Sequence, residues 1–283
     1  MPTQSGDPAP HRHRRTAESF GVDAERYDRT RRRYPRALID RIAAALPGPR
    51  VLDAGCGTGI VARQFRDAGH DVLGVEPDAR MAEFARGTGI GVETARFEEW
   101  DPNGRTFDAV VSGQAWHWID PAEGAVRAAR ALRGGGVLSV FWHAFHPPSA
   151  VAEAFADAFE QAAPDAPFDV RALDKGSAGH EAFLAPAEEG MKAAGAFTAP
   201  ERWRFDWECR YTRDEWLDQL PTHGALTRLP PEAADGILRK VGEAIDALGG
   251  EFTVEYSTVA VTAMTVAAPG TPDGETADPP QAE

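Results

Sequence analysis

The stretch VLDAGCGTG, residues 51–59, places three glycines at alternating positions directly after a short apolar run. Glycines let a backbone turn tightly and approach a ligand closely. Asp53 lies in this apolar run. Glu76 ends the next apolar run, and its distance from the glycines along the chain is typical of a carboxylate that binds both hydroxyls of a ribose. We therefore expect a cofactor site here, and the alternative is a tight turn beside an exposed acid.

The exact spacing of the glycines bears on which cofactor is bound. The dinucleotide fingerprint G-x-G-x-x-G would need a glycine at position 60, where the chain has Ile60. The chain also shows no hydride-transfer pattern. A nicotinamide oxidoreductase is therefore disfavoured.

Histidines follow two of the predicted strands and could act on an acceptor molecule. In WHWID, residues 116–120, His117 is expected at the floor of a pocket, with Trp118 as an apolar wall. It could orient the acceptor or remove its proton, because histidine titrates near neutral pH. The alternative is a histidine that only packs in the turn. His223, in LPTHGAL, is the second candidate, and His143 is expected at the pocket rim.

No metal site is expected from these histidines. The HAFH spacing of residues 143–146 is not that of a helical metal-binding pair, and no cysteine or acid beside it completes a ligand set.

Arginine and tyrosine alternate near the N-terminus. Tyr27, Arg31 and Tyr34 have the i, i+4, i+7 spacing that places side chains on one face of a helix. The guanidinium of Arg31 is suited to two-point recognition of a carboxylate. This face is expected either to bind substrate and cofactor or to dock the N-terminal helix on the core.

Apolar runs alternate with amphipathic segments along most of the chain, which indicates βαβ units and a parallel sheet covered on both faces. Strands are expected at residues 50–54, 71–77, 91–95, 107–112, 134–142, 203–212 and 252–264. Helices are expected at residues 38–46, 60–68, 78–86, 121–132, 214–220 and 231–248, with alanine-rich helical stretches at 149–163 and 181–195.

These elements predict a core interrupted by an insertion. We expect a disordered N-terminal tail (1–16), a cofactor-binding core (17–144), a helical lid (145–200), closing strands and helices of the core (201–266) and a disordered acidic tail (267–283).

The composition limits the class of partner. The chain of 283 residues carries 30 lysines and arginines against 44 acids, a formal net charge of −14, so nucleic acid is not expected as a partner. No apolar stretch approaches the roughly 18–20 residues of a membrane span. Two distant cysteines match no metal spacing, and a reduced, cytoplasmic setting fits best.

Three motifs carry a family resemblance. VLDAGCGTG, VLGVEPDARM and FDAVVSGQAWHWID resemble the class I S-adenosylmethionine-dependent methyltransferases over residues 17–144. QAWHW and AERYDRTRRRYP are similar to the small-molecule branch that includes trans-aconitate-type carboxyl methyltransferases. The resemblance implies an α/β fold, a Rossmann-like seven-stranded and mostly parallel sheet with helices on both faces.

The resemblance also implies roles for individual residues. Glu76 would hold the ribose, and Asp53 and Gly55 would face the methionine end of the cofactor. Arg96 occupies the position where the family often has an acid that binds the adenine amino group. Phe97 or Glu98 would therefore contact the adenine instead. The implied cofactor-binding residues are Tyr27, Asp53, Gly55, Gly57, Gly59, Glu76, Pro77, Phe97, Glu98, Ser112 and Gln114.

The expected activity is methyl transfer from S-adenosylmethionine to an oxygen of a small molecule. A carboxylate oxygen is expected in preference to a hydroxyl oxygen. His117, His223 and Arg31 are the expected catalytic residues, and Tyr34, Trp118 and His143 are expected to contact the acceptor. The alternatives are N- or C-methylation in secondary metabolism and a non-catalytic module that binds S-adenosylmethionine.

Overall fold

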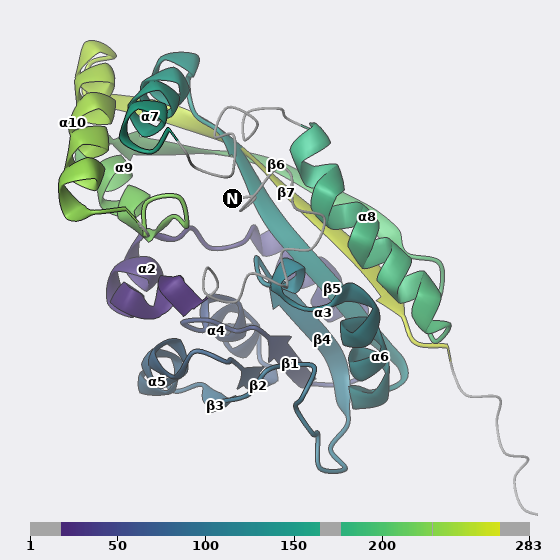
Figure 1. The fold of residues 1–283 in the computed structure, drawn as a ribbon. Helices are drawn as coiled ribbons and strands as arrows, with labels where there is room; N and C mark the ends of the chain where they lie inside the picture. The colour runs from purple at the N-terminus through teal and green to yellow at the C-terminus, as the bar shows by residue number, and fades with distance from the viewer. Residues whose placement is uncertain (1–17, 165–176, 228, 267–283) are drawn as a thin grey trace, which may run out of the picture.

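A sheet of seven strands, in the order β3-β2-β1-β4-β5-β7-β6, organises the molecule (Figure 1). The computed structural model describes residues 18–164, 177–227 and 229–266, so the two expected tails, 1–16 and 267–283, lie outside the described residues. Strands β1 to β5 are parallel, and β7 runs antiparallel between β5 and β6. The expected seven-stranded, mostly parallel α/β sheet is confirmed.

The strand boundaries agree closely with the apolar runs, except that β5 is much longer than expected. The strands are β1 (Arg50–Ala54), β2 (Asp71–Val75), β3 (Gly91–Glu93), β4 (Phe107–Gly113), β5 (Leu132–His146), β6 (Glu201–Thr212) and β7 (Glu251–Met264).

The helices also lie close to their expected positions. They are α2 (Ala24–Thr30), α3 (Arg36–Ala44), α4 (Ile60–Asp67), α5 (Ala79–Gly87), α6 (Pro121–Ala131), α7 (Ser149–Ala162), α8 (Ser177–Ala194), α9 (Arg213–Gln219) and α10 (Pro231–Ala247), with short 3₁₀ turns η2 (Glu18–Asp23), η3 (Trp116–Trp118) and η5 (Leu220–Thr222). Asp78 caps α5 through its side chain, which accepts a hydrogen bond from the Arg80 N–H (2.9 Å).

Two apolar layers enclose the sheet. On one face, Leu38 and Ile42 of α3 and Phe65 of α4 pack against β1, β4 and β5. On the other face, α6 and α8 cover the sheet, with Leu184 and Met191 of α8 buried against it. Strands β1 and β4 between these layers are buried on both faces, which explains their continuous apolar sequences.

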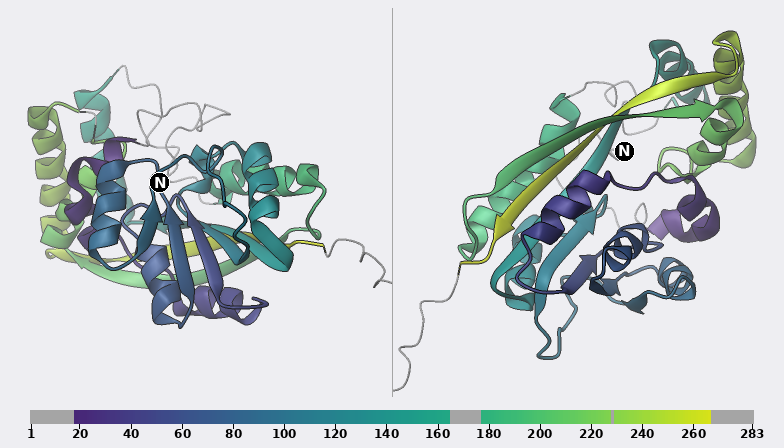
Figure 2. Two further views of the ribbon diagram at one scale, coloured as in Figure 1. Left: turned by 90° about the horizontal axis from the view of Figure 1, so that it is seen from below. Right: turned by 180° about the vertical axis from the view of Figure 1, so that it is seen from behind.

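A second apolar cluster lies beyond the parallel core. The far ends of β5, β6 and β7 extend past β1–β4 and carry α7, α9 and α10 (Figures 1 and 2). Val151 of α7, Val241 of α10 and Val254 of β7 are buried in this cluster. The long strands therefore connect the parallel core to a helical group at one end of the molecule.

The helical segment expected as one lid over 145–200 is divided in the structure. Helix α7 packs on α10 in the second cluster, whereas α8 packs on α6 and forms part of the core layer. Strand β5 also continues to His146, across the expected boundary at 144. Helix α8 presents apolar residues at helical spacing to the sheet. Burying these residues against the sheet is more favourable than leaving them exposed in a lid over the cavity.

No helix among the described residues combines the length and the apolar character that crossing a membrane requires.

The close contact of α8 with α6 can be tested with two glycines. A Cβ on Gly190 of α8 would lie 2.2 Å from the carbonyl oxygen of Pro121, whereas a Cβ on Gly236 of α10 would meet nothing within 4 Å. We expect Gly190→Ala to lower the free energy of unfolding by about 1–3 kcal/mol, because the helices must separate. Gly236→Ala should raise it by about 0.5–1 kcal/mol, since alanine favours a helix interior.

Urea denaturation of the two variants and the unchanged protein measures both effects. A Gly190→Ala protein as stable as the Gly236→Ala protein would contradict the described packing of α8.

Candidate active site

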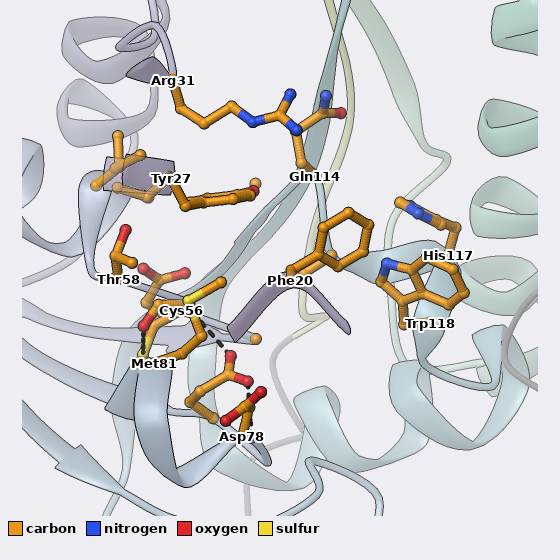
Figure 3. A pocket seen from close by; sticks show the side chains of 18 of the residues that line it. Phe20, Tyr27, Arg31, Cys56, Thr58, Asp78, Met81, Gln114, His117 and Trp118 are labelled. Atoms are coloured by element: carbon orange, nitrogen blue, oxygen red, sulfur yellow. Dashed lines mark hydrogen bonds between the residues drawn. The ribbon is translucent and has the colours of Figure 1, made fainter. Parts of the chain in front are cut away.

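A cavity of about 270 Å³ lies at the carboxyl ends of β1, β2 and β4 (Figure 3). This edge of a parallel sheet is where such folds bind ligands. The acidic lining residues are Asp53 in β1, Glu76 and Asp78 after β2, and Glu98 after β3, and we call this part the acidic end. The opposite part, the arginine end, is lined by Arg31, Arg32, Tyr34, His143, Phe145, Gln219, His223 and Tyr256.

The glycine loop after β1 forms one wall of the acidic end. Gly55 has φ 70°, and a Cβ there would lie 2.6 Å from the Cβ of Ala115. Gly57 has φ 55°, and its N–H donates to Oε2 of Glu76 (2.8 Å). A side chain at either position would strain the turn, so both glycines are required by the backbone.

Gly59 and Ser112 do not line the cavity, contrary to the expectation that both would face the cofactor. Gly59 starts α4, and its Cβ position faces Ala85 of α5. The buried hydroxyl of Ser112 donates to the carbonyl oxygen of Ala54 (2.7 Å) and ties β4 to β1. Both residues support the cavity wall from behind.

Asp53 is the most deeply buried acid of the cavity, with only 1% of its surface exposed. Its carboxylate makes no hydrogen bond of normal geometry to the described residues. Burial, only partly offset by the N–H of Ala62, raises the pKa of Asp53 to about 8. A buried carboxylate of this kind is suited to a cationic ligand group.

Glu76 holds the turn after β2. Its Oε1 accepts a hydrogen bond from the N–H of Asp78 (2.9 Å), and its Oε2 accepts that of Gly57. Burial raises the pKa of Glu76 to about 7, and the two N–H groups oppose this shift. Each oxygen keeps lone pairs for a further donor such as a hydroxyl group.

Pro77, Met81, Phe97 and Glu98 complete the acidic end. Phe97 packs on Trp100 and Trp116, so its ring belongs to the core as well as to the cavity wall. Glu98 accepts hydrogen bonds from Arg96 (3.2 Å) and from the N–H of Asp120 (3.3 Å). The expected adenine-facing residues therefore lie together, with Arg96 paired to Glu98.

Helix α2 and η2 cover the cavity. The ring of Phe20 contacts Tyr27 (6.1 Å between centroids) and Trp118 (6.2 Å), and it lies between them in Figure 3. A Cβ on Gly21 would lie 2.1 Å from the carboxylate of Asp78, so the backbone of η2 rests directly on the start of α5. The N-terminal segment closes the acidic end from above.

Tyr27, Arg31 and Tyr34 all line the cavity but do not share a helix face, so the expected geometry is wrong. Helix α2 ends at Thr30, and Arg31 takes an extended conformation (φ −74°, ψ 136°). Pro35 disfavours a helical conformation for the preceding residue, which is why the helix cannot continue through Tyr34. The three side chains are brought together by the loop between α2 and α3.

The guanidinium of Arg31 lies at the arginine end. It donates to the carbonyl oxygen of Thr222 (2.8 Å), stacks on Tyr27 at 4.8 Å, and its buried Nε has no hydrogen-bond partner among the described residues. Gln114 also lines the cavity, and its side chain is labelled in Figure 3. Gln114 has φ 55°, an uncommon left-handed conformation for a residue other than glycine and one often associated with functional sites.

Arg32 lies at the same end. Its Nε donates to the hydroxyl of Tyr211 (2.9 Å), and its guanidinium stacks on that ring. No acid lines the arginine end among the described residues, so a ligand there meets a positive potential.

His117 lies on the floor of the cavity in η3, as expected, beside Trp118 (4.7 Å) and Phe183 (4.9 Å). Its Nδ1 accepts a hydrogen bond from the indole N–H of Trp142 (3.1 Å). In the neutral ring the proton is therefore on Nε2. Burial lowers the pKa of His117 to about 3, so the ring is a neutral donor and not a base at neutral pH.

His143 and Tyr34 form a stacked pair at the arginine end, with ring centroids 4.2 Å apart. The Nδ1 of His143 lies 2.9 Å from the hydroxyl of Thr258, which also accepts the indole N–H of Trp207. Burial lowers the pKa of His143 to about 3. The pair is thus an uncharged wall fixed from β6 and β7.

His223 reaches the cavity from the turn after η5. Burial and the nearby charge of Arg31 lower its pKa well below the usual range, so the ring is neutral.

Several lining residues were not singled out from the sequence: Phe20, Met81, Phe145, Gln219 and Tyr256. An aromatic residue three positions before the helix-capping Asp23 was a usable signal for Phe20. Phe145 and Tyr256 carry no such signal, because only the register of β5 with β7 places them at the cavity. The described residues contain no cluster of histidine, cysteine or acid side chains arranged for a metal ion.

The sequence is similar to known methyltransferases. Residues 27–157 match a methyltransferase domain family model. An uncharacterised methyltransferase of Mycobacterium tuberculosis is 39% identical over 129 residues, which are 44% of this chain and 52% of that protein. A malonyl-acyl carrier protein O-methyltransferase of Enterobacter lignolyticus is 36% identical over 129 residues, 44% of this chain and 51% of that protein. The chain thus spans about half the length of these relatives.

The fold resembles that of a protein from Anaeromyxobacter dehalogenans assigned to the type II methyltransferases. The TM-score is 0.62 at 21% identity, and the match covers 84% of this chain and 99% of that one. The match to the family model, the strand order and the glycine loop at the cavity agree. The chain therefore carries, at residues 27–157, a methyltransferase domain of the class I, S-adenosylmethionine-dependent type.

Proposed function

We propose that this protein transfers a methyl group from S-adenosylmethionine to an oxygen of a small molecule, and that the oxygen belongs to a carboxylate. The observation that carries this proposal is the charge of the cavity. Arg31 and Arg32 lie at the end opposite the acids, and the Nε of Arg31 has no partner among the described residues. A carboxylate is the acceptor that fits a guanidinium with a free donor.

The residues of the acidic end fit the cofactor. Asp53, a buried carboxylate without a normal hydrogen bond, would face the ammonium group, and Glu76 would accept from the ribose hydroxyls. Pro77 and Phe97 would flank the adenine, and Tyr27 would cover the methionine part. The bound cofactor supplies a methyl group already activated by its positive sulfur.

The chain itself must align the acceptor and exclude water. A carboxylate is ionised at neutral pH and needs no base, which agrees with the neutral, donor state of His117. The Nε2–H of His117 would orient an acceptor oxygen, and Phe20 with Trp118 would keep water from the reacting atoms. His143 and Tyr34 would form an uncharged wall beside the acceptor.

The relatives support oxygen as the acceptor atom, because proteins named as O-methyltransferases are among them. An amine acceptor would bring positive charge close to Arg31 and Arg32, which disfavours N-methylation. The net charge of −14 disfavours a nucleic-acid acceptor.

The experiment that tests the proposal is release of S-adenosylhomocysteine with a panel of small carboxylic acids, phenols and amines, followed by mild base treatment of the products. We expect turnover on acids with base-labile methyl esters. Turnover on phenols or amines alone would contradict the carboxylate assignment. Cofactor binding without turnover on any compound would favour the binding module.

Arg31 should be needed for the acceptor and dispensable for the cofactor. We expect Arg31→Ala to lower kcat/KM for carboxylic acids about 10- to 100-fold, because a hydrogen bond to a charged group is worth about 1.5–3 kcal/mol. The matched control is Arg36→Ala, since the Arg36 side chain is 80% exposed and pairs with Asp40 outside the cavity. Equal kcat/KM in both variants would remove Arg31 from acceptor binding.

Cofactor binding should release a proton near neutral pH. Asp53 has a pKa of about 8 in the free protein, so its carboxyl is mostly protonated at pH 7. An ammonium group opposite Asp53 lowers that pKa, the proton leaves, and affinity rises from about pH 6 to about pH 8. Titration calorimetry with S-adenosylhomocysteine at pH 7, in phosphate and in Tris, measures the released proton as a difference in heat.

Asp53→Asn should shrink this difference in heat, and Asp40→Asn, at an exposed acid, should not. Identical heats in the two buffers for the unchanged protein would contradict the placement of the ammonium group.

His117 should act as a hydrogen-bond donor. We expect His117→Phe to lower kcat about 10- to 100-fold, as for the loss of one hydrogen bond to a charged group, and His117→Gln to lose less because its amide still donates. With both substrates saturating, kcat of the unchanged protein should show no histidine-like titration between pH 5 and 8, since the pKa of His117 is about 3. A titration near pH 6–7 that disappears in His117→Gln would instead establish a base.

A further inference from the structure

His223 is a buried polar side chain that the chain leaves without a partner. Only 1% of its surface is exposed, and it lines the cavity. Neither Nδ1 nor Nε2 has a hydrogen-bond partner among the described residues. Buried polar groups are nearly always hydrogen-bonded, and one that faces a ligand cavity without a protein partner indicates a contact with the ligand.

The backbone of His223 is held in position by hydrogen bonds. Its N–H donates to the carbonyl oxygen of Leu220 (2.9 Å), and its carbonyl oxygen accepts the N–H of Leu226 (2.8 Å). The edge-on ring of Phe145, 5.9 Å away, is apolar and offers no hydrogen bond. The residue is therefore anchored at the cavity wall through its backbone, while its imidazole makes no hydrogen bond to the described residues.

We propose that the acceptor is a carboxylic acid that carries a hydroxyl group close to its carboxylate, and that His223 binds this second group. The inference rests on the function proposed above and specifies its substrate class. It makes His223 a specificity-determining residue at the arginine end.

The second group should be uncharged because of what surrounds His223. The guanidinium of Arg31 donates to Thr222, the residue next to His223, and its positive charge disfavours a second positive charge on the imidazole. A neutral imidazole has one donor and one acceptor nitrogen. It therefore pairs with a hydroxyl group better than with another anion.

The second group should also lie close to the carboxylate. Arg31, whose Nε is unpartnered, donates to the carbonyl oxygen of Thr222, the residue before His223, and its charge acts on the imidazole of His223, whose two nitrogens are also unpartnered. A ligand that binds its carboxylate at Arg31 presents the neighbouring atoms to His223. The nearby lining residues Gln219, Gly224 and Tyr256 bring no acid that would compete for either group.

Matched pairs of acids that differ by one hydroxyl group test the proposal. Suitable pairs are benzoate with 2-hydroxybenzoate, phenylacetate with mandelate, and 3-phenylpropanoate with 3-phenyllactate. The kcat/KM of each is measured by release of S-adenosylhomocysteine. In at least one pair we expect the unchanged protein to prefer the hydroxylated acid about tenfold or more, because a site built to bind a hydroxyl discriminates against the analogue that lacks it.

Substitution of His223 should remove this preference. In His223→Leu the ratio within the pair should fall to about one, and in His223→Gln, which can still donate and accept, part of it should remain. His70→Leu is the matched control, because His70 packs on Phe65 and does not line the cavity. It should keep the full preference. Calorimetric binding of S-adenosylhomocysteine, unchanged within about twofold, shows that the variants are folded.

Three results would overturn the proposal. Equal kcat/KM within every pair in the unchanged protein would mean that His223 does not bind a hydroxyl group of the acceptor, as would be the case if an ordered water satisfied it. A preference that persists in His223→Leu and His223→Gln would assign the recognition to another residue. Failure to methylate any carboxylic acid would overturn the proposed function itself, and this result is distinct because both members of each pair are then inactive.

Discussion

The antiparallel pairing of β7 with both β5 and β6 is the interaction on which the arginine end of the cavity depends. The pairing of β5 with β7 runs from Val137 opposite Met264 to His146 opposite Glu255, well beyond the parallel core. This extension places His143, Phe145 and Tyr256 at the cavity and supports the apolar cluster of α7, α9 and α10. Shorter strands would leave the acidic end of the cavity without the arginine end opposite it.

The cavity holds two sets of buried polar groups at separate ends. Acids lie at one end, and histidines and arginines lie at the other. At the acidic end, burial keeps Asp53 and Glu76 partly protonated near neutral pH until a cationic or hydroxyl-bearing ligand arrives. At the arginine end, burial keeps His143 and His223 neutral beside a permanently charged guanidinium. Positively and negatively charged ligand groups therefore have different favoured positions in one cavity.

The sequence predicts the sheet well because a strand buried on both faces appears in the sequence as a continuous apolar run, as for β1 and β4. Gly55, Gly57 and Glu76 are also predictable, since a tight turn and a strand-end acid are local features. Most of the predictions that failed depend on contacts between elements that are distant in the sequence. Pro35 ends the supposed Tyr27–Tyr34 helix face, packing on α6 draws α8 into the core, and Gly59 faces α5. The unpartnered state of His223 depends on residues far away in the chain, so no local pattern could show it.

A crystal structure of the ternary complex with S-adenosylhomocysteine and a carboxylic acid that is methylated tests the central claim most directly. The account predicts the ammonium group of the cofactor beside Asp53, the ribose on Glu76, and the acceptor carboxylate within hydrogen-bond distance of Arg31. A carboxylate bound without contact to Arg31, or a cofactor whose adenine occupies the arginine end, would contradict it.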